Sequence, residues 1–291
     1  MTERLLLSLG HGYSARALAR RLGSEWQVIG TTRTEEKAAR LTKEGITARI
    51  WPGTDLSADI AAATHVLASA GPGSTGDPFL PEIAGPLRKA RPVWVGYLST
   101  TGVYGDHGGA WVDEDTPLVA STERGARRVE AEQAWQALAD AAGWPLHIFR
   151  LAGIYGPGRG PFAKVARGEA RRIVKPGQVF SRIHVDDIAQ VLDASIAAPV
   201  LGGRAYNLCD DEPAPPQDVL AYAAELLGVP APPEVPFENA ALSPMARSFY
   251  AENKRVRNDR IKGELGVRLL YPTYREGLQA LRSQELAESG E

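Results

Sequence analysis

Cysteine is almost absent from this sequence of 291 residues, in which Cys209 is the only one. A single cysteine excludes an internal disulfide and any metal site built from several cysteines. It also suits a reducing compartment, so a cytoplasmic location is expected. No activating partner for Cys209 is apparent in the sequence, and the residue is therefore predicted to lie in the core.

Long apolar runs and a strong charge imbalance are absent as well. The first apolar run, Leu5–Leu9, is short and ends at a glycine, so it matches neither a signal peptide nor a membrane span. The formal net charge is −2, which gives no global reason to expect nucleic acid or a membrane surface as a partner. The hydrophobic content of 44% is typical of a globular protein with a sizeable core.

The start of the chain contains a glycine turn between an apolar strand and a helix. Residues 10–15 read GHGYSA, which has the G-x-G-x-x-A spacing of a dinucleotide-binding turn. Gly10 can adopt backbone angles that a side chain would block, and Gly12 lets a pyrophosphate approach closely. Ala15 is small enough for tight packing of the helix, whose free N–H groups and dipole favour phosphate. The alternative is a purely structural turn; the sequence favours a dinucleotide site.

The end of the second predicted strand indicates which dinucleotide binds. No acid stands there to bind the adenosine ribose; the chain has Thr32 and Arg33, with Lys37 one helical turn further. Arginine pairs well with phosphate, so NADP is predicted in preference to NAD. The alternative is that Arg33 is an ordinary surface arginine. Asp55 and Leu56, after the third strand, suit either a contact to adenine or a simple loop cap.

Strands and helices alternate along most of the chain, which predicts an α/β fold with a Rossmann-type, doubly wound parallel sheet. The alternation fades after about residue 209, where proline-rich breaks begin. We therefore predict a Rossmann domain formed by residues 1–152 and 183–209. Residues 153–182 and 210–291 are predicted to form a smaller, C-terminal substrate domain.

Four segments together resemble one family. Residues 9–15, 98–105, 150–158 and 183–189 read LGHGYSA, LSTTGVYG, RLAGIYGPG and IHVDDIA. Their order and spacing resemble the extended short-chain dehydrogenase/reductases, in particular the NAD(P)-dependent epimerases and dehydratases that act on nucleotide sugars. The resemblance implies a hydride-transferring enzyme of this kind, and a homodimer formed through the long helix would be common in the family.

The resemblance implies a catalytic Tyr-x-x-x-Lys pair on a long helix and an upstream Ser or Thr, which falls here on Thr100. The pair itself is replaced, because its positions fall on Arg124 and Arg128. Arg128 can still bond a ribose, but Arg124 cannot act as an acid or base since its pKa is too high. The one literal Tyr-x-x-x-Lys, Tyr250 to Lys254, lies far downstream and is interpreted as a chance spacing.

Two hypotheses about function follow. In the first, the protein is an NADP-dependent oxidoreductase or an epimerase/dehydratase-like enzyme with a non-standard active site. Tyr104 is then the expected acid or base, with Tyr155 and His107 as further candidates. In the second, the protein is a catalytically silent NADP-binding sensor or interaction protein. The loss of the helix pair favours the second hypothesis, whereas Thr100 and the retained substrate side favour the first.

The predicted substrate contacts are basic. Arg159 and Arg182 lie in regions that face the substrate in the related epimerases, and they would suit a small anionic molecule such as a nucleotide sugar. His184, Asp186 and Asp187 have a spacing that suggests metal ligands, but a helix cap at Asp186 or Asp187 explains it, so no metal is predicted. The residues predicted to bind the dinucleotide are Gly10, His11, Gly12, Tyr13, Thr32, Arg33, Lys37, Asp55, Leu56, Ser69, Ala70, Ser99 and Arg128.

Overall fold

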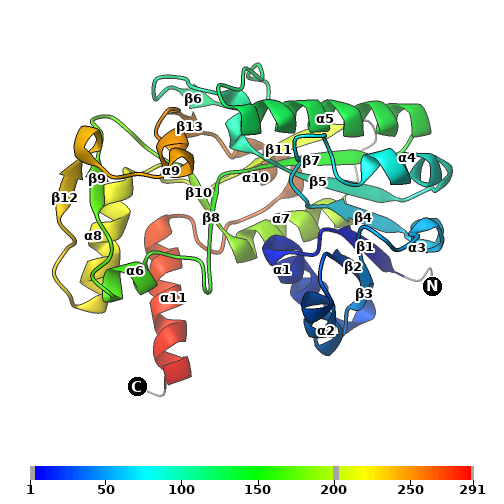
Figure 1. The fold of residues 1–291 in the computed structure, drawn as a ribbon, viewed down its shortest axis with the longest axis horizontal. Coiled ribbons are helices and arrows are strands. Elements are labelled where there is room, and N and C mark those ends of the chain that lie inside the picture. The colour runs from blue at the N-terminus through cyan, green and yellow to red at the C-terminus, as the bar shows by residue number, and fades with distance from the viewer. Residues whose placement is uncertain (1–3, 199–202, 290–291) are drawn as a thin grey trace.

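A parallel sheet of seven strands forms the centre of the computed structural model, which describes residues 4–198 and 203–289. The predicted domains also include residues 1–3, 199–202 and 290–291, which lie outside the described residues. Along the sheet the order is β11-β7-β5-β4-β1-β2-β3, and every pair is parallel (Figure 1). This arrangement confirms the predicted α/β Rossmann-type fold. The strands are β1 (Leu5–Leu9), β2 (Gln27–Thr32), β3 (Thr47–Ile50), β4 (His65–Ala68), β5 (Trp94–Thr100), β7 (Leu146–Leu151) and β11 (Arg204–Leu208).

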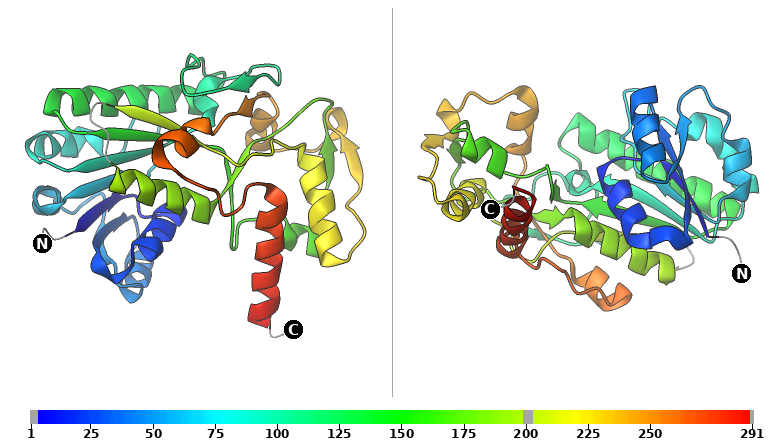
Figure 2. Two further views of the ribbon diagram at one scale, coloured as in Figure 1. Left: turned by 180° about the vertical axis from the view of Figure 1, so that it is seen from behind. Right: turned by 90° about the horizontal axis from the view of Figure 1, so that it is seen from below.

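Helices cover both faces of this sheet (Figures 1 and 2). Local signals set their ends: Thr34 caps the start of α2 and Thr122 that of α5, while Gly143 ends α5 at a φ of 72°. One face carries α1 (Tyr13–Leu22), α2 (Glu35–Lys43) and α7 (Val185–Ala197), and the other α3 (Ser57–Ala62), α4 (Leu80–Lys89) and α5 (Glu123–Ala142).

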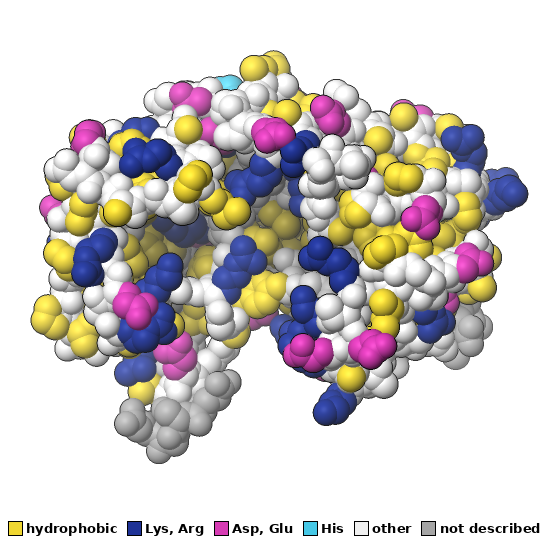
Figure 3. Space-filling view, viewed as in Figure 1, with side chains coloured by type: hydrophobic (Ala, Val, Ile, Leu, Met, Phe, Trp, Pro, Cys, Tyr) yellow, Lys and Arg dark blue, Asp and Glu magenta, His cyan; other side chains and the backbone are white. Residues whose placement is uncertain are grey.

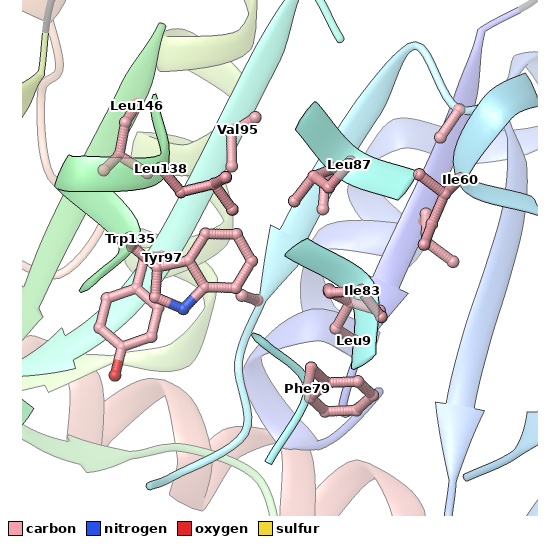
Figure 4. Close-up of a cluster of buried hydrophobic side chains, with 14 of the residues drawn as sticks. Leu9, Ile60, Phe79, Ile83, Leu87, Val95, Tyr97, Trp135, Leu138 and Leu146 are labelled. Carbon is pink, nitrogen blue, oxygen red and sulfur yellow. The ribbon is translucent and has the colours of Figure 1, made fainter. Parts of the chain in front are cut away.

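The core divides into two layers because side chains alternate along each strand. Leu7 and Leu9 of β1 pack under α3, α4 and α5, whereas Leu6 packs on the opposite side with α1 and α7. Figure 4 shows the first layer, in which Trp135 of α5 lies beside Tyr97 of β5 with ring centroids 5.9 Å apart. The two packed layers hold the ends of the strands, and therefore the loops that follow them, in fixed positions.

The C-terminal part lies to one side of the sheet, next to the ends of its strands (Figure 2). Three helices, α6 (Phe162–Ala166), α8 (Pro216–Leu227) and α11 (Tyr274–Ser289), share a small core. Short ladders join its segments: β8 (Gly153–Tyr155) pairs with β10 (Arg182–His184), β9 (Arg172–Val174) with β12 (Glu234–Pro236), and β6 (Trp111–Val112) with β13 (Arg255–Val256). Three 3₁₀ turns, η1 (Gly23–Glu25), η2 (Thr101–Tyr104) and η3 (Phe237–Asn239), and the short helix α9 (Pro244–Phe249) complete the described elements outside α10.

The course of the chain after residue 250 differs from the predicted division. The helix α10 (Asp259–Leu265) returns to the sheet, where its Ile261 and the following Val267 pack in the same layer as α1 and α7. This stretch therefore belongs to the sheet core and not to the substrate side. Cys209 is fully buried beside it, and its Sγ donates to the carbonyl oxygen of Val256, which confirms the prediction of a core cysteine.

The HVDD stretch at the start of α7 is organised differently from the prediction. His184 caps the helix, because its Nδ1 accepts a hydrogen bond of 3.2 Å from the N–H of Asp186. Asp187 instead accepts the backbone N–H groups of Leu270 and Tyr271 and so ties α7 to the chain beyond α10. Among the helices of the described residues, none combines the length and the apolar character that a membrane span requires.

Candidate functional site

The glycine turn has the geometry that a dinucleotide requires. Gly10 has a φ of 82°, and a Cβ at this position would lie 2.9 Å from the Cβ of Ala70. Only glycine fits there, because both the angle and the contact exclude a side chain. The N–H of Gly10 donates to Thr31 Oγ1 over 2.7 Å and that of His11 to the Thr31 carbonyl, while Ser69 Oγ donates to the carbonyl of Gly10. These bonds fix the turn between β2 and β4.

The start of α1 faces a cavity of about 840 Å³. Gly12, Tyr13 and Ser14 line it, and no side chain caps the first turn of the helix. The space where a Cβ of Gly12 would stand meets only the Gly10 carbonyl, at 3.7 Å. The uncapped first turn and the open backbone at Gly12 fit the pyrophosphate of a dinucleotide.

The ends of β5 and α5 form another wall of this cavity. Ser99 and Thr100 line it, and Thr100 Oγ1 accepts the N–H of Gly102 over 3.2 Å, which caps η2. Gly125 of α5 packs so tightly on η2 that an added Cβ would lie 2.7 Å from the Gly102 carbonyl. The structure thus brings the predicted Thr100 into the same cavity as the glycine turn.

The two arginines at the positions of the family's Tyr and Lys also line the cavity. Arg128 donates to the Leu98 carbonyl over 2.6 Å and to the Tyr97 hydroxyl over 3.0 Å. Arg124 lies over the ring of Phe249, 4.6 Å from its centroid. Arg128 is therefore fixed against β5, whereas Arg124 reaches across to the last residue of α9.

Arg159 and Arg182 reach the cavity from the substrate side, where the sequence placed them. Arg159 lies over the ring of Tyr13, 5.7 Å from its centroid. One nitrogen of Arg182 donates to the carbonyls of Phe180 and Ala214, at 2.8 and 3.1 Å. The Tyr13 hydroxyl in turn donates over 3.0 Å to the carbonyl of Pro157, a second contact between α1 and the substrate side.

Positive charge dominates the lining of this cavity. Figure 3 shows Lys and Arg side chains around the hollow at the centre of the view. Within residues 4–198 and 203–289, none of the cavity arginines forms an ion pair with a carboxylate. Only the lysine is paired, with the one carboxylate of the lining, over 2.6 Å. The cations that line the cavity are Arg124, Arg128, Arg159, Arg182 and Lys254, and the carboxylate is Glu252.

Tyr104 does not occupy the position expected of an acid or base. It is fully buried and does not line the cavity; its hydroxyl donates to Asn207 Oδ1 over 2.7 Å and accepts from Arg150 over 3.0 Å. Burial raises the pKa of Tyr104 to about 12. The expectation that Tyr104 transfers a proton to the substrate is therefore corrected. His107 also lies outside the cavity, with its Nε2 3.1 Å from the Tyr104 carbonyl oxygen.

Two residues that the sequence analysis set aside do line the cavity. They are Tyr250 and Lys254, the literal Tyr-x-x-x-Lys of the C-terminal part. Tyr155 lines it as well, but its hydroxyl is directed at Gly277 of α11. The spacing of Tyr250 and Lys254 was the feature of the sequence that could have pointed to these residues. Its relevance is apparent only in the fold, where the chain after α9 runs along the cavity.

The residues predicted at the adenosine end lie outside the main cavity. Arg33 and Lys37 are exposed, and neither has an ion-pair partner within the described part of the chain. Thr32 is half-buried beside them at the end of β2. Their charges are thus free to meet a phosphate group.

Two further predicted residues line a separate cavity of about 310 Å³ between the β3–α3 loop and α4. Asp55 Oδ1 accepts the N–H of Ser57 over 2.9 Å, the loop cap that was the simpler alternative, and Leu56 is buried. The ring of His11 is buried against Gly30 without a hydrogen-bond partner among the described residues, and burial lowers its pKa to about 4.

Comparison with known proteins places this chain in one family. A model of the NAD dependent epimerase/dehydratase family matches residues 83–209. Protein YeeZ of Escherichia coli (strain K12) is 31% identical over 284 residues, which cover 91% of this chain and 95% of that protein. The chain belongs to the NAD dependent epimerase/dehydratase family and has the NAD(P)-binding, oxidoreductase-like fold of that family.

Two other similar proteins differ in how much is known of them. The structure of a conserved protein of unknown function from Silicibacter pomeroyi DSS is 58% identical, with a TM-score of 0.88, and the match covers 97% of this chain and 99% of that one. A 3-diazoavenalumate denitrifying reductase from Streptomyces sp is 31% identical over 185 residues, 57% of this chain and 58% of that protein.

More distant structures share the fold alone. Human epimerase family protein SDR39U1, solved with NADPH, is 20% identical with a TM-score of 0.73 over 96% of this chain and 99% of that one. MoeE5, solved with UDP-glucose and NAD, is 18% identical with a TM-score of 0.75 over 99% and 100%. Structures of this fold therefore occur with either dinucleotide.

Proposed function

We propose that the protein is an NADP-dependent oxidoreductase whose substrate carries a negative charge. The observation that carries this proposal is one cavity that joins the glycine turn to four arginines without carboxylate partners. Arginine side chains in a cavity are only partly solvated by water. A bound anion therefore stabilises them more strongly than it would on an open surface. A nucleotide sugar is one substrate of this kind.

The chain's own residues divide the work of binding. The glycine turn and the first turn of α1 hold the pyrophosphate, and Arg128 bonds the ribose next to the nicotinamide. The bound dinucleotide supplies or accepts a hydride. Thr100 binds the reacting oxygen of the substrate, and Arg159 and Arg182 hold its charged group.

The choice of NADP rests on the end of β2. Arg33 and Lys37 are exposed there without ion-pair partners in the described residues, and the last residue of the strand, Thr32, is not an acid. The 2′-phosphate of NADP would interact with two cations at this position. NAD lacks this phosphate and would make only weak contacts there.

Fluorescence titration with NADPH and NADH tests this choice. We expect the wild type to prefer NADPH, and Arg33→Asp to lose about tenfold or more in NADPH affinity with little change for NADH. Arg40→Asp, which makes the same charge change on the exposed surface of α2, serves as the control and should retain the preference. Equal affinity of the wild type for both dinucleotides would contradict the choice of NADP.

The charge of the substrate is tested by NADPH oxidation with matched pairs of carbonyl compounds, each an acid and its methyl ester. We expect turnover of the acid in preference to the ester, because only the acid offers a carboxylate to the cavity arginines. Equal turnover of both members of every pair would contradict an anionic substrate.

One observation favours a second function, a catalytically silent NADP-binding sensor: α5 carries Arg124 and Arg128 where an enzyme of the family carries Tyr and Lys. A sensor would bind NADPH with the same preference and would oxidise it with none of the carbonyl pairs.

A further inference from the structure

The segment of residues 249–254 crosses from the substrate side to the place where the family's catalytic pair would stand. At its start, the ring of Phe249 lies under Arg124, the residue at the position of the missing tyrosine. In its middle, Glu252 accepts a hydrogen bond of 2.7 Å from the hydroxyl of Ser121, just before α5. The segment is thus fixed to the beginning of α5, the helix that carries Arg124 at the position of the family's tyrosine.

The far end of this segment is fixed to the turn that carries Thr100. Lys254 Nζ donates over 2.7 Å to the carbonyl of Gly105, the residue after η2. The N–H of Asn253 donates over 2.7 Å to Asp106. Lys254 is also paired with Glu252, so its ammonium group anchors the segment and is not free to act on a ligand.

Tyr250 is the residue that this segment presents to the cavity. Its ring is held edge-on to Phe180, with centroids 5.4 Å apart, and is tilted against Phe237 at 5.1 Å. Its own carbonyl accepts the ammonium group of Lys175. The side chain is therefore ordered by packing, with only 8% of the residue exposed.

The hydroxyl of Tyr250 is free, unlike those of the other tyrosines in the lining. Tyr13 donates to Pro157, and the hydroxyl of Tyr155 is sealed in against Gly277. In the described part of the chain, the Tyr250 hydroxyl has no hydrogen-bond partner and is not among the sealed groups. An ordered phenol with an unused proton and access to the cavity has the properties of a proton donor.

We propose that Tyr250 is the catalytic acid of this protein and replaces the tyrosine that α5 lacks. This inference rests on the proposed reduction of a carbonyl compound. NADPH, when bound, supplies the hydride that reduces the carbonyl carbon. As the C=O double bond is reduced, the oxygen takes the proton of Tyr250, so that an O–H bond forms on the product while the phenol O–H bond breaks. Water then returns a proton to the phenolate.

The charges around Tyr250 suit this role. Arg182 of β10 is the cation whose field favours the phenolate, and Lys175 stands on the loop after β9. Glu252 is the carboxylate of the same segment, but Lys254 neutralises it. Burial raises the pKa of Tyr250 while Arg182 opposes the rise, so the phenol is protonated at neutral pH and its conjugate base is stabilised.

The test follows the ionisation of Tyr250 by ¹⁹F NMR in protein labelled with 3-fluorotyrosine. The chain has nine tyrosines, and Tyr250→Phe and Tyr155→Phe assign the two resonances of interest. Each resonance is titrated with pH in the presence of saturating NADP⁺ and, separately, of saturating NADPH. Oxidised nicotinamide is positively charged and reduced nicotinamide is not, so a phenol next to the ring ionises more easily with NADP⁺.

We expect the acid dissociation constant of Tyr250 to be about tenfold or more higher with NADP⁺ than with NADPH. The Tyr155 resonance is expected to show no ionisation with either, because burial strongly raises the pKa of Tyr155. Fluorescence titration checks dinucleotide binding in the same samples. Binding of both dinucleotides with an identical Tyr250 titration would overturn this inference and leave the proposed function intact. Absence of dinucleotide binding would overturn both.

Discussion

Asp210 lies next to the cavity arginine Arg182 and is almost fully buried. One of its carboxylate oxygens has no hydrogen-bond partner among the described residues, and the other accepts the N–H of Glu212 over 3.3 Å. Burial raises the pKa of Asp210 to about 8, although Arg182 opposes the rise. Near pH 7 this carboxyl group is therefore mostly neutral, and the charge of Arg182 remains available for a ligand.

The raised pKa of Asp210 predicts how stability depends on pH. Its folded pKa lies above its unfolded pKa, so its contribution to stability is complete below about pH 4 and is lost as the pH rises through about 8. Asp210→Asn removes this loss. We expect the variant to match the wild type near pH 4 and to exceed it by about 5 kcal/mol in free energy of unfolding near pH 8. Urea denaturation at both pH values measures the difference, and an equal difference at both would contradict the titration.

At the scale of single residues, the sequence predicted the placement of those residues whose position follows from the local backbone. Glycine is required at position 10 because its φ is positive and because the chain after β4 passes close to it. The position of Thr100 is set by the end of β5, of which it is the last residue. Tyr104 also follows a strand end, but the sequence does not tell which side of the turn its ring takes, and it turns into the core. Tyr250 could not be predicted, because its access to the cavity depends on contacts with residues more than a hundred positions away.

Gly125 determines how α5 is seated against η2, and so the position of one wall of the cavity. It lies in the first turn of the helix, where Thr122 accepts its N–H over 3.1 Å. The Gly102 carbonyl lies so close that the helix can take this position only without a side chain there. The element as a whole is therefore placed by a backbone contact, in addition to its buried Trp135.

Two glycine-to-alanine variants separate this packing from helix propensity. Gly125→Ala is expected to lower the free energy of unfolding by about 1–3 kcal/mol, because the added methyl group forces α5 away from η2. Gly263→Ala in the exposed part of α10, where the new Cβ meets no neighbouring element within 4 Å, is expected to raise it by about 0.5–1 kcal/mol. Urea denaturation measures both. If Gly125→Ala were as stabilising as Gly263→Ala, the close contact would be excluded.

The long strands and helices could be predicted because their signals are local: apolar alternation, caps and glycine stops. The short ladders could not. β6 pairs with β13 and β9 with β12 although these segments lie far apart in the sequence, and two or three residues carry no period of their own. The packing of α10 against the sheet could not be predicted either. The contribution of Ile261 and Val267 to the sheet core depends on contacts that exist only in the folded structure.

On the scale of the whole molecule, the sheet and the C-terminal part meet around one cavity and are joined by polar contacts at its edges. One of them is the hydrogen bond from Tyr13, at the start of α1, to the Pro157 carbonyl in the loop after β8. Nothing in the sequence indicated that the helix expected to hold the phosphates would also contact the loop after β8.

Removal of this bond is predicted to change the rates of cofactor exchange. Tyr13→Phe keeps the ring under Arg159 but loses the hydrogen bond, which is worth about 0.5–1.5 kcal/mol. We expect NADPH to associate and dissociate about 2- to 10-fold faster, because the loop separates from α1 more easily in either direction. Stopped-flow fluorescence measures both rates. Unchanged rates would show that the loop does not obstruct the path of the cofactor.

The contact between Tyr13 and Pro157 also has a consequence for turnover. A substrate-side loop tied to the phosphate-binding helix makes the residence time of the dinucleotide depend on residues that touch neither the nicotinamide nor the reacting carbon. For the proposed reductase, we expect exchange of spent for fresh cofactor, and not the chemical step, to limit the steady-state rate. Selection for speed would accordingly act on the loop of residues 156–161 before it acts on the groups that transfer the proton.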